Sequence, residues 1–259
     1  MENLTNKVIQ EKAKDIRDNY DFTVSPRGME VREQIGGKYT VPMPAYIDLK
    51  DRKVNADFMF GEAAWIISGS NRLEDLTETM KSYANYSDNG ITLEGAYGPK
   101  VIDQLNYVVD TLENDRDSRQ AIIGIWRERP RPSKDIPCTL NMGFMIREDR
   151  LQMVVNMRSH DIVLGSTYDV FSFSAVGNVV RLLLKDRGIN IPLDENGTFG
   201  DLTVNANSLH LYERHYNAID NWVDSSDRDL KIGQRVINVM KAENYSEFIS
   251  MLKAEARNE

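Results

Sequence analysis

Apolar residues recur at intervals of three and four in several stretches of the chain, which is typical of helices that bury one face. One stretch places Leu73, Leu76 and Met80 on the same side. Elsewhere Pro99 suits a first helical turn, and Gly188 suits a C-cap. The predicted helices cover 3–18, 72–84, 99–112, 170–187, 209–219 and 246–256.

Other stretches are short and rich in Ile, Val, Met and Phe, the composition of paired strands. They lie at 120–127, 141–147 and 150–157, and 21–48 mixes short apolar runs with Gly and Pro as strands and turns do. Strands and helices are interspersed without regular βαβ alternation, which predicts an α+β fold. No linker is evident, so we expect residues 1–259 to form a single domain.

Composition narrows the classes of partner. The chain has 259 residues, 41% hydrophobic and 28% charged, with a formal net charge of -8. Such an acidic surface repels nucleic acid, so direct nucleic-acid binding is not expected. A few clustered arginines still suffice for a small phosphorylated ligand.

The cysteine and histidine content argues against a metal site. One cysteine excludes an intrachain disulfide and a cysteine-rich metal centre. His160, His210 and His215 show no convincing metal-ligand spacing, so no metal is expected. The polar N-terminal stretch does not resemble a signal peptide, and no apolar run reaches membrane-spanning length. We therefore expect a cytoplasmic protein without a membrane partner.

Cys138 lies between an arginine-rich loop and a predicted strand. A lone cysteine is usually a small buried apolar residue. Here Arg127, Arg129 and Arg131 precede it closely, and Arg158 follows one strand later. Unless these arginines only form a solvated face, they should lower the thiol pKa and enrich the reactive thiolate. The context therefore favours a nucleophile.

Arg158 and Ser159 are adjacent, and an arginine fork with a hydroxyl can bind one phosphate.

Glu62 lies in an apolar stretch, where burial should raise its pKa and suit it to proton transfer. Asp169 precedes an apolar helix, which by itself indicates an N-cap. His210 and Tyr212, taken alone, indicate packing in a helix.

The order of these features along the chain is more specific than any one of them. It resembles the thymidylate synthase superfamily over about residues 20–222, and the Cys and Arg-Ser-x-Asp segments are its most specific parts. The matching segments, in order, are Glu62 with Trp65 and Gly69, Tyr97-Gly98, Asp117-Ser118-Arg119, Pro137-Cys138, Arg158-Ser159-x-Asp161-x-x-Leu164-Gly165, Asp169, and His210-x-Tyr212.

The resemblance implies a large mixed sheet packed with helices and a homodimer formed back to back through that sheet. It implies that Cys138 adds to C6 of a pyrimidine nucleotide. C5 then attacks the one-carbon unit of 5,10-methylenetetrahydrofolate, the co-substrate. Glu62 would relay protons, with Tyr97 lining the same cavity. The resemblance assigns folate contacts to Asp161, Gly165 and Trp65.

The remaining roles implied by the resemblance concern the nucleotide. Arg158 and Ser159 would hold the 5′-phosphate, and Arg119 would reach the phosphate bound by the other subunit. His210 and Tyr212 would bind the 3′-hydroxyl of the sugar. A last phosphate contact is expected from a residue near the N-terminus, Arg27.

The most informative departure from the synthases is at position 169. They carry an asparagine that pairs with uracil, whereas this chain has Asp169. A carboxyl group can accept from the 4-amino group of cytosine and share a proton with N3. A base with the wrong polar edge leaves a buried group unpaired, which discriminates strongly. Asp169 therefore predicts dCMP.

Segments around Arg158 and His210 also resemble the phage deoxycytidylate hydroxymethylases, in which water adds to the intermediate and no hydride leaves the folate. Three further departures are Thr139 for a histidine, Gln120 for a second arginine, and a chain end without the apolar tail that closes over folate. Loss of that closure would admit water. Tyr83 occupies a position where relatives carry tryptophan.

Several alternatives stay open. A dCMP methylase would reduce the same intermediate, and a CMP enzyme would use the ribonucleotide. Asp169 argues against a thymidylate synthase and against a dUMP hydroxymethylase. A catalytically inactive nucleotide- or RNA-binding relative is disfavoured by Cys138, Glu62 and Arg158, and an unrelated α+β domain is the remaining possibility.

Overall fold

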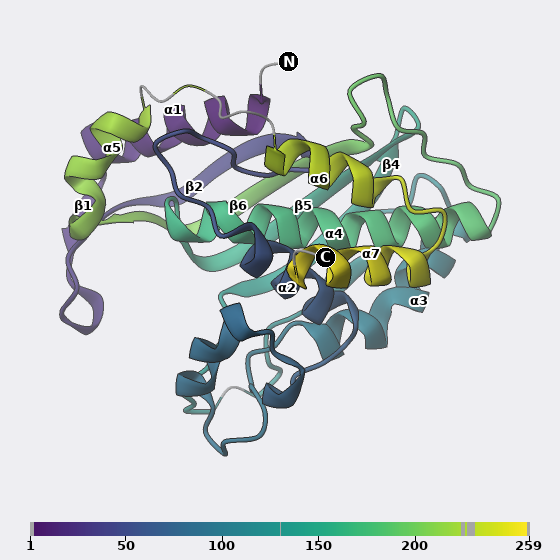
Figure 1. Cartoon of the computed structure of the whole chain (residues 1–259), viewed down its shortest axis with the longest axis horizontal. Coiled ribbons are helices and arrows are strands. Elements are labelled where there is room, and N and C mark those ends of the chain that lie inside the picture. Colours follow the sequence, from purple (N-terminus) through teal and green to yellow (C-terminus); the bar gives the residue numbers. More distant parts are fainter. Residues whose placement is uncertain (1–2, 130, 224–225, 227–230, 258–259) are drawn as a thin grey trace.

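The computed structural model describes residues 3–129, 131–223, 226 and 231–257. Its centre is a mixed sheet of six strands in the order β1-β2-β6-β5-β4-β3, in which only β5 and β6 pair in parallel (Figure 1). The strands are β1 (Phe22–Val24), β2 (Val31–Met43), β3 (Ile122–Gly124), β4 (Thr139–Arg147), β5 (Arg150–Asp161) and β6 (Gly200–Tyr212). The predicted α+β fold is confirmed.

Helices pack against this sheet, and the longest of them, α4, runs across its centre (Figure 1). The α-helices described are α1 (Leu4–Asp18), α2 (Ala56–Ile67), α3 (Gly98–Asn114), α4 (Leu164–Asp186), α5 (Tyr216–Val223), α6 (Lys231–Met240) and α7 (Tyr245–Arg257). Most side chains of α4 are buried, because it lies between the sheet and helices α2, α3 and α7. Among the described residues, no helix is long and apolar enough to cross a membrane.

The two faces of the sheet differ in polarity. Along β5 the buried residues Met153, Val155 and Met157 alternate with half-buried ones. On the half-buried face Asn156 donates to Asn141 at 2.8 Å and accepts from Asn205 at 3.1 Å. One apolar face under helices and one partly polar face is the usual arrangement of antiparallel pairs. Dimerisation through the second face stays a prediction.

Two predicted helices are wrong. The range 209–219 begins as strand, because β6 extends through Tyr212 and is paired on both edges, by β2 and by β5. Within 72–84 the chain forms short 3-10 helices at Leu73–Asp75 and Glu78–Tyr86. They are separated at Leu76, whose backbone is extended. Of the spaced apolar residues there, only Met80 is buried, so packing does not hold a continuous helix.

The start of α4 also differs from the expectation. The helix begins at Leu164, so Asp169 lies inside it and is not an N-cap. Asp161 acts at the helix start instead, where its carboxylate accepts from the backbone N–H groups of Val163 at 2.8 Å and Leu164 at 3.2 Å. The Asp169 side chain therefore projects from the side of the helix.

Candidate active site

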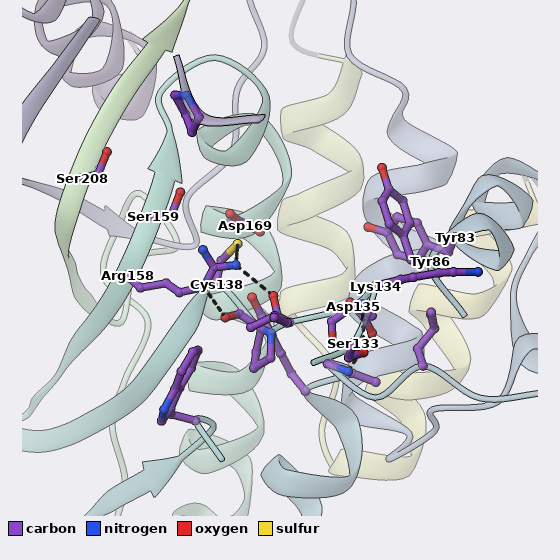
Figure 2. Close-up of a pocket in the computed structure, with 18 of the residues that line it drawn as sticks. Tyr83, Tyr86, Ser133, Lys134, Asp135, Cys138, Arg158, Ser159, Asp169 and Ser208 are labelled. Carbon is purple, nitrogen blue, oxygen red and sulfur yellow. Dashed lines mark hydrogen bonds between the residues drawn. The ribbon is translucent and has the colours of Figure 1, made fainter. Parts of the chain in front are cut away.

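A cavity of about 960 Å³ opens where α2, α4, the C-terminal halves of β5 and β6 and the loop before β4 meet (Figure 2). This volume is near the upper end for small-molecule sites. Ten of the predicted site residues line it: Arg27, Glu62, Trp65, Tyr97, Cys138, Arg158, Ser159, Asp169, His210 and Tyr212. The fold thus brings together residues that are far apart in sequence.

Cys138 sits immediately before β4 and is held by Arg158 of the neighbouring strand. The Arg158 backbone N–H donates to the Cys138 carbonyl at 2.8 Å. Its guanidinium donates to the carbonyls of Pro137 at 2.9 Å and Ile136 at 3.1 Å, and its Nη2 lies 3.6 Å from the Cys138 Sγ (Figure 2). One arginine therefore fixes the loop and places a positive charge against the thiol.

The thiol does not have the low pKa expected from the sequence. Burial raises the pKa of Cys138, the Arg158 charge lowers it, and the Asp169 charge raises it again. The predicted net lowering of the thiol pKa is thus wrong, because desolvation outweighs the cations. Arg158 still acts in the expected direction, since opposite charge favours the thiolate.

The other arginines near Cys138 in sequence have different partners. Arg127 donates to the Asp135 carbonyl at 2.7 Å, and Arg131 forms an exposed ion pair with Glu94 at 3.1 Å. Neither is among the main causes of the shift of the thiol pKa, whereas Arg27 is. The cationic environment of Cys138 therefore comes from distant parts of the chain.

Glu62 projects from α2 and is buried. It accepts hydrogen bonds from the Tyr83 hydroxyl and, at 3.2 Å, from the Ser172 hydroxyl. Burial, followed by the charge of Asp169, raises the pKa of Glu62 to about 7. A carboxyl with this pKa gains and loses protons near neutrality, which suits general acid or base chemistry.

Tyr97 lies at the start of α3 with its hydroxyl toward the loop that carries Cys138. The hydroxyl accepts from the Thr139 backbone N–H at 3.3 Å. Burial raises the Tyr97 pKa above its usual range, so the phenol keeps its proton. Tyr97 can therefore donate a hydrogen bond into the cavity.

Asp169 faces the cavity from α4 beside Cys138 (Figure 2). Its Oδ2 lies 3.4 Å from Nδ1 of the buried His160. Gly165 makes room for this approach, since a Cβ there would lie 3.0 Å from the His160 Nδ1 and 3.1 Å from the Asp169 Oδ2. Asp169 is thus supported from behind and exposed on its cavity side.

Near Arg158 the cavity combines hydroxyls and cations suited to a phosphorylated sugar. Ser159 of β5 lies opposite Ser208 of β6, and His210 lines the cavity two residues further along β6. Exposed Arg27 lines the cavity from the loop before β2. The His210 ring packs edge-on against Tyr212 with centroids 5.2 Å apart. Burial lowers the pKa of His210, so the ring is a neutral hydrogen-bonding group.

Three predicted residues do not border the cavity. Asp161 caps the start of α4, and Gly165 lies behind Asp169. Arg119 is exposed, before β3. Within this chain Asp161 and Gly165 therefore support the site, while Arg119 is open to a neighbouring molecule.

Several lining residues were not predicted from the sequence. Trp126 and Asp135 lie in loops, Tyr86 ends the 3-10 helix Glu78–Tyr86, and Ser208 lies within the central strand β6. His160 was considered only as a metal ligand. Among the described residues, no cluster of three or more potential ligands could hold a metal ion.

A thiol, a guanidinium and two carboxyl groups in one cavity define a site for covalent chemistry on a small anionic ligand. Residues 2–251 match the thymidylate synthase family model, and the chain belongs to that family. Its fold is accordingly that of the thymidylate synthase family.

Individual relatives agree on the family and differ in substrate. A deoxyuridylate hydroxymethyltransferase of Pseudomonas phage M6 is 28% identical over 197 residues, which are 72% of this chain and 53% of that protein. A deoxycytidylate 5-hydroxymethyltransferase of Enterobacteria phage T6 is 26% identical over 214 residues, 78% of this chain and 84% of that protein. The chain spans about half the length of the deoxyuridylate relatives it matches.

The fold has a solved counterpart. Thermostable thymidylate synthase A from Bacillus subtilis superposes with a TM-score of 0.69 at 20% identity, covering 86% of this chain and 85% of that one. This likeness supports the fold and, at that identity, carries no argument about substrate.

Proposed function

We propose that the protein transfers a one-carbon unit to C5 of dCMP and adds water, giving 5-hydroxymethyl-dCMP. The observation that carries this proposal is the Asp169 carboxyl group in the same cavity as Cys138 and Arg158. An amide side chain offers uracil one hydrogen-bond donor and one acceptor. A carboxyl group instead complements the 4-amino group and N3 of cytosine.

In the proposed mechanism the Cys138 thiolate adds to C6 of the base. The C5–C6 π pair shifts into a C4–C5 double bond and the C4–N3 π pair moves onto N3. Through its contact with the Asp169 carboxyl group, N3 takes up the proton that the Cys138 thiol gives up. C5 is then nucleophilic. Arg158, whose charge favours the thiolate, would also bind the 5′-phosphate together with Ser159 and Arg27. The substrate phosphate would then share the positive charge of Arg158 with the thiolate. The bound base would exclude water from the thiolate.

The cavity is suited to a second, flat ligand. Trp65, Tyr83, Tyr86 and Trp126 line it, and aromatic side chains stack well on heteroaromatic rings. The indole N–H of Trp65 is buried without a partner among the described residues. Methylenetetrahydrofolate would supply the one-carbon unit there and leave as tetrahydrofolate. Glu62 would accept the proton lost from C5 and orient the water that adds to the new exocyclic carbon, with Tyr97 lining the same space. Expulsion of the Cys138 thiolate from C6 would then restore the C5–C6 double bond.

A second subunit would complete the phosphate site. Arg119 is exposed before the edge strand β3, and the half-buried sheet face offers polar side chains such as Asn156. We infer that two chains pair through this face and that Arg119 of one approaches the nucleotide of the other. His210 and Tyr212 would then hold the sugar 3′-hydroxyl.

Hydroxymethylation of dUMP is the second candidate, because several relatives carry that name. Reductive methylation of dCMP and use of CMP are the remaining alternatives. They are separated by incubating the protein with methylenetetrahydrofolate and each nucleotide, then identifying the product by mass and dihydrofolate by absorbance. A hydroxymethyl product from dCMP without dihydrofolate supports the proposal. Dihydrofolate with a methyl product, or a product from dUMP or CMP alone, contradicts it.

A further inference from the structure

His160 is a buried side chain behind the cavity whose two ring nitrogens face different surroundings. It lies on β5 and is 1% exposed. Its Nε2 is 2.7 Å from the Tyr39 hydroxyl and 3.2 Å from the Ser166 hydroxyl. Its Nδ1 makes no hydrogen bond within standard limits to any described residue, and Asp169 Oδ2 lies 3.4 Å away. A buried ring nitrogen without a hydrogen-bond partner costs free energy, so we expect it to acquire one.

The surroundings of Nε2 determine where the ring carries its proton. Burial raises the pKa of Tyr39 far above its usual range, so this phenol keeps its proton and donates it. The nearest acceptor is the His160 Nε2, since the Ser166 hydroxyl is farther from Tyr39, at 3.3 Å. In a neutral imidazole one nitrogen accepts and the other donates. With Nε2 accepting, the proton is on Nδ1, and the Asp169 Oδ2 lies 3.4 Å from that nitrogen.

The backbone keeps the space between the two groups clear. Gly165 lies one helical turn before Asp169, and its missing Cβ is what lets the ring and the carboxyl approach. The distance of 3.4 Å is longer than a usual N–H···O bond.

We propose that His160 is a positioning residue that donates through Nδ1 to one oxygen of Asp169 and turns the other oxygen toward the 4-amino and N3 edge of a cytosine base. This inference rests on the proposed function and extends it to the selection of the base. As a proton passes to N3 at one oxygen of Asp169, the His160 N–H stays hydrogen-bonded to the other oxygen.

A pair of substitutions separates the two ring nitrogens. In His160→Asn the amide nitrogen can take the place of Nδ1 and still donate to Asp169. In His160→Gln the amide reaches toward Tyr39 and Ser166 and leaves Asp169 unsupported. We expect His160→Asn to keep the wild-type ratio of dUMP to dCMP dissociation constants within about threefold. His160→Gln should reduce it by about tenfold or more, the size of one matched polar contact in a buried site.

The same substitutions are made in an Asp169→Asn background, and calorimetric titration with dCMP and dUMP gives the coupling between the two positions. Thermal unfolding checks that each variant is folded. We expect His160→Gln to lower the ratio of dUMP to dCMP dissociation constants in the wild-type background. In the Asp169→Asn background it should change that ratio less than twofold. The proposal is overturned if a folded His160→Gln keeps the wild-type ratio, or if the ratio falls equally in both backgrounds, since then His160 acts only on packing.

The proposed function fails separately from this inference. If the wild type binds dUMP more tightly than dCMP, the proposed substrate is wrong and the assignment of His160 to cytosine selection falls with it. If the wild type prefers dCMP and positions 160 and 169 show no coupling, the substrate stands and only the role of His160 is lost.

Discussion

The Nη2 atom of Arg158 lies 3.6 Å from the Sγ atom of Cys138, while the same guanidinium holds the carbonyls of Pro137 and Ile136. The charge is therefore placed against the sulfur by hydrogen bonds to the loop that carries the cysteine. A guanidinium is suited to this because its donors diverge in a rigid plane. One side chain therefore both positions the thiol and lowers its pKa against the effect of burial.

Replacing Arg158 by Gln should slow alkylation of Cys138 by iodoacetamide several-fold at neutral pH, with the pH midpoint moved upward. The reason is that Arg158 lowers the pKa of this thiol and thiolate is the reactive form. Arg116→Gln is the matched control, because Arg116 pairs with the exposed Asp149. Equal alkylation rates in both variants would show that Arg158 does not polarise the thiol.

Cys138→Ser should abolish turnover while leaving nucleotide binding within a few-fold of wild type. A hydroxyl is far less ionised than a thiol at neutral pH, but it keeps the shape of the cavity. Calorimetry measures binding, and product analysis by mass measures turnover. Near-wild-type turnover in this variant would exclude a covalent adduct at Cys138.

Glu62 should make stability depend on pH. Its folded-state pKa is about 7 against an ordinary 4.5, so the folded protein binds the extra proton between these values. The stabilisation is complete below pH 4.5 and is lost as pH rises through 7. Relative to Glu62→Gln, the wild type should therefore lose on the order of 3 kcal/mol of unfolding free energy between pH 4.5 and pH 8.

Urea unfolding at several pH values measures this difference. Glu78→Gln changes an exposed carboxyl in the nearby Glu78–Tyr86 segment and serves as the control. The plot of unfolding free energy against pH for Glu78→Gln should run parallel to that of the wild type. If the plot for Glu62→Gln is also parallel to that of the wild type, the pKa of Glu62 is not raised in the folded protein.

Gly165→Ala should weaken dCMP binding several-fold. The added Cβ would lie 3.0 Å from the His160 Nδ1 and 3.1 Å from the Asp169 Oδ2, closer than ordinary packing allows. Gly124→Ala is the control, since its Cβ would meet only the Gln104 Oε1, at 3.7 Å. Unchanged affinity in Gly165→Ala would mean that Asp169 can move without loss of nucleotide binding.

Local pattern was enough to predict several elements of this fold. Helices near both ends of the chain and the helix starting by Pro99 correspond to α1, α7 and α3, and Gly188 follows α4 in a left-handed conformation. Their apolar spacing is strong and their packing faces are simple. Amphipathic α6 (Lys231–Met240) was not predicted.

Elements that depend on distant pairing were harder to predict. Leu209 and Tyr212 have helical spacing with Tyr216, yet they belong to β6, whose partners β2 and β5 supply hydrogen bonds on both edges. Tertiary pairing overrides local preference in such strands. The parallel register that sets Ser159 beside Ser208 cannot be obtained from either segment alone.

In the site, too, local motifs could be predicted from the sequence, whereas contacts between distant elements could not. Motif order predicted Cys138 with Arg158, and the cavity contains both. The tyrosine bound to Glu62 and the histidine behind Asp169 were not assigned these contacts. The helical spacing of Tyr83 with Leu73, Leu76 and Met80 gives no information about Glu62. The contacts of Tyr83 and His160 could not be predicted because their partners lie on other elements.

The most direct test of the account is tritium release from 5-tritiated dCMP and dUMP in the presence of methylenetetrahydrofolate, for the wild type and for Asp169→Asn. We expect the wild type to release tritium from dCMP without forming dihydrofolate, and the variant to shift its preference toward dUMP. Wild-type release from dUMP in preference to dCMP, or the same preference in both proteins, would contradict the role given to Asp169.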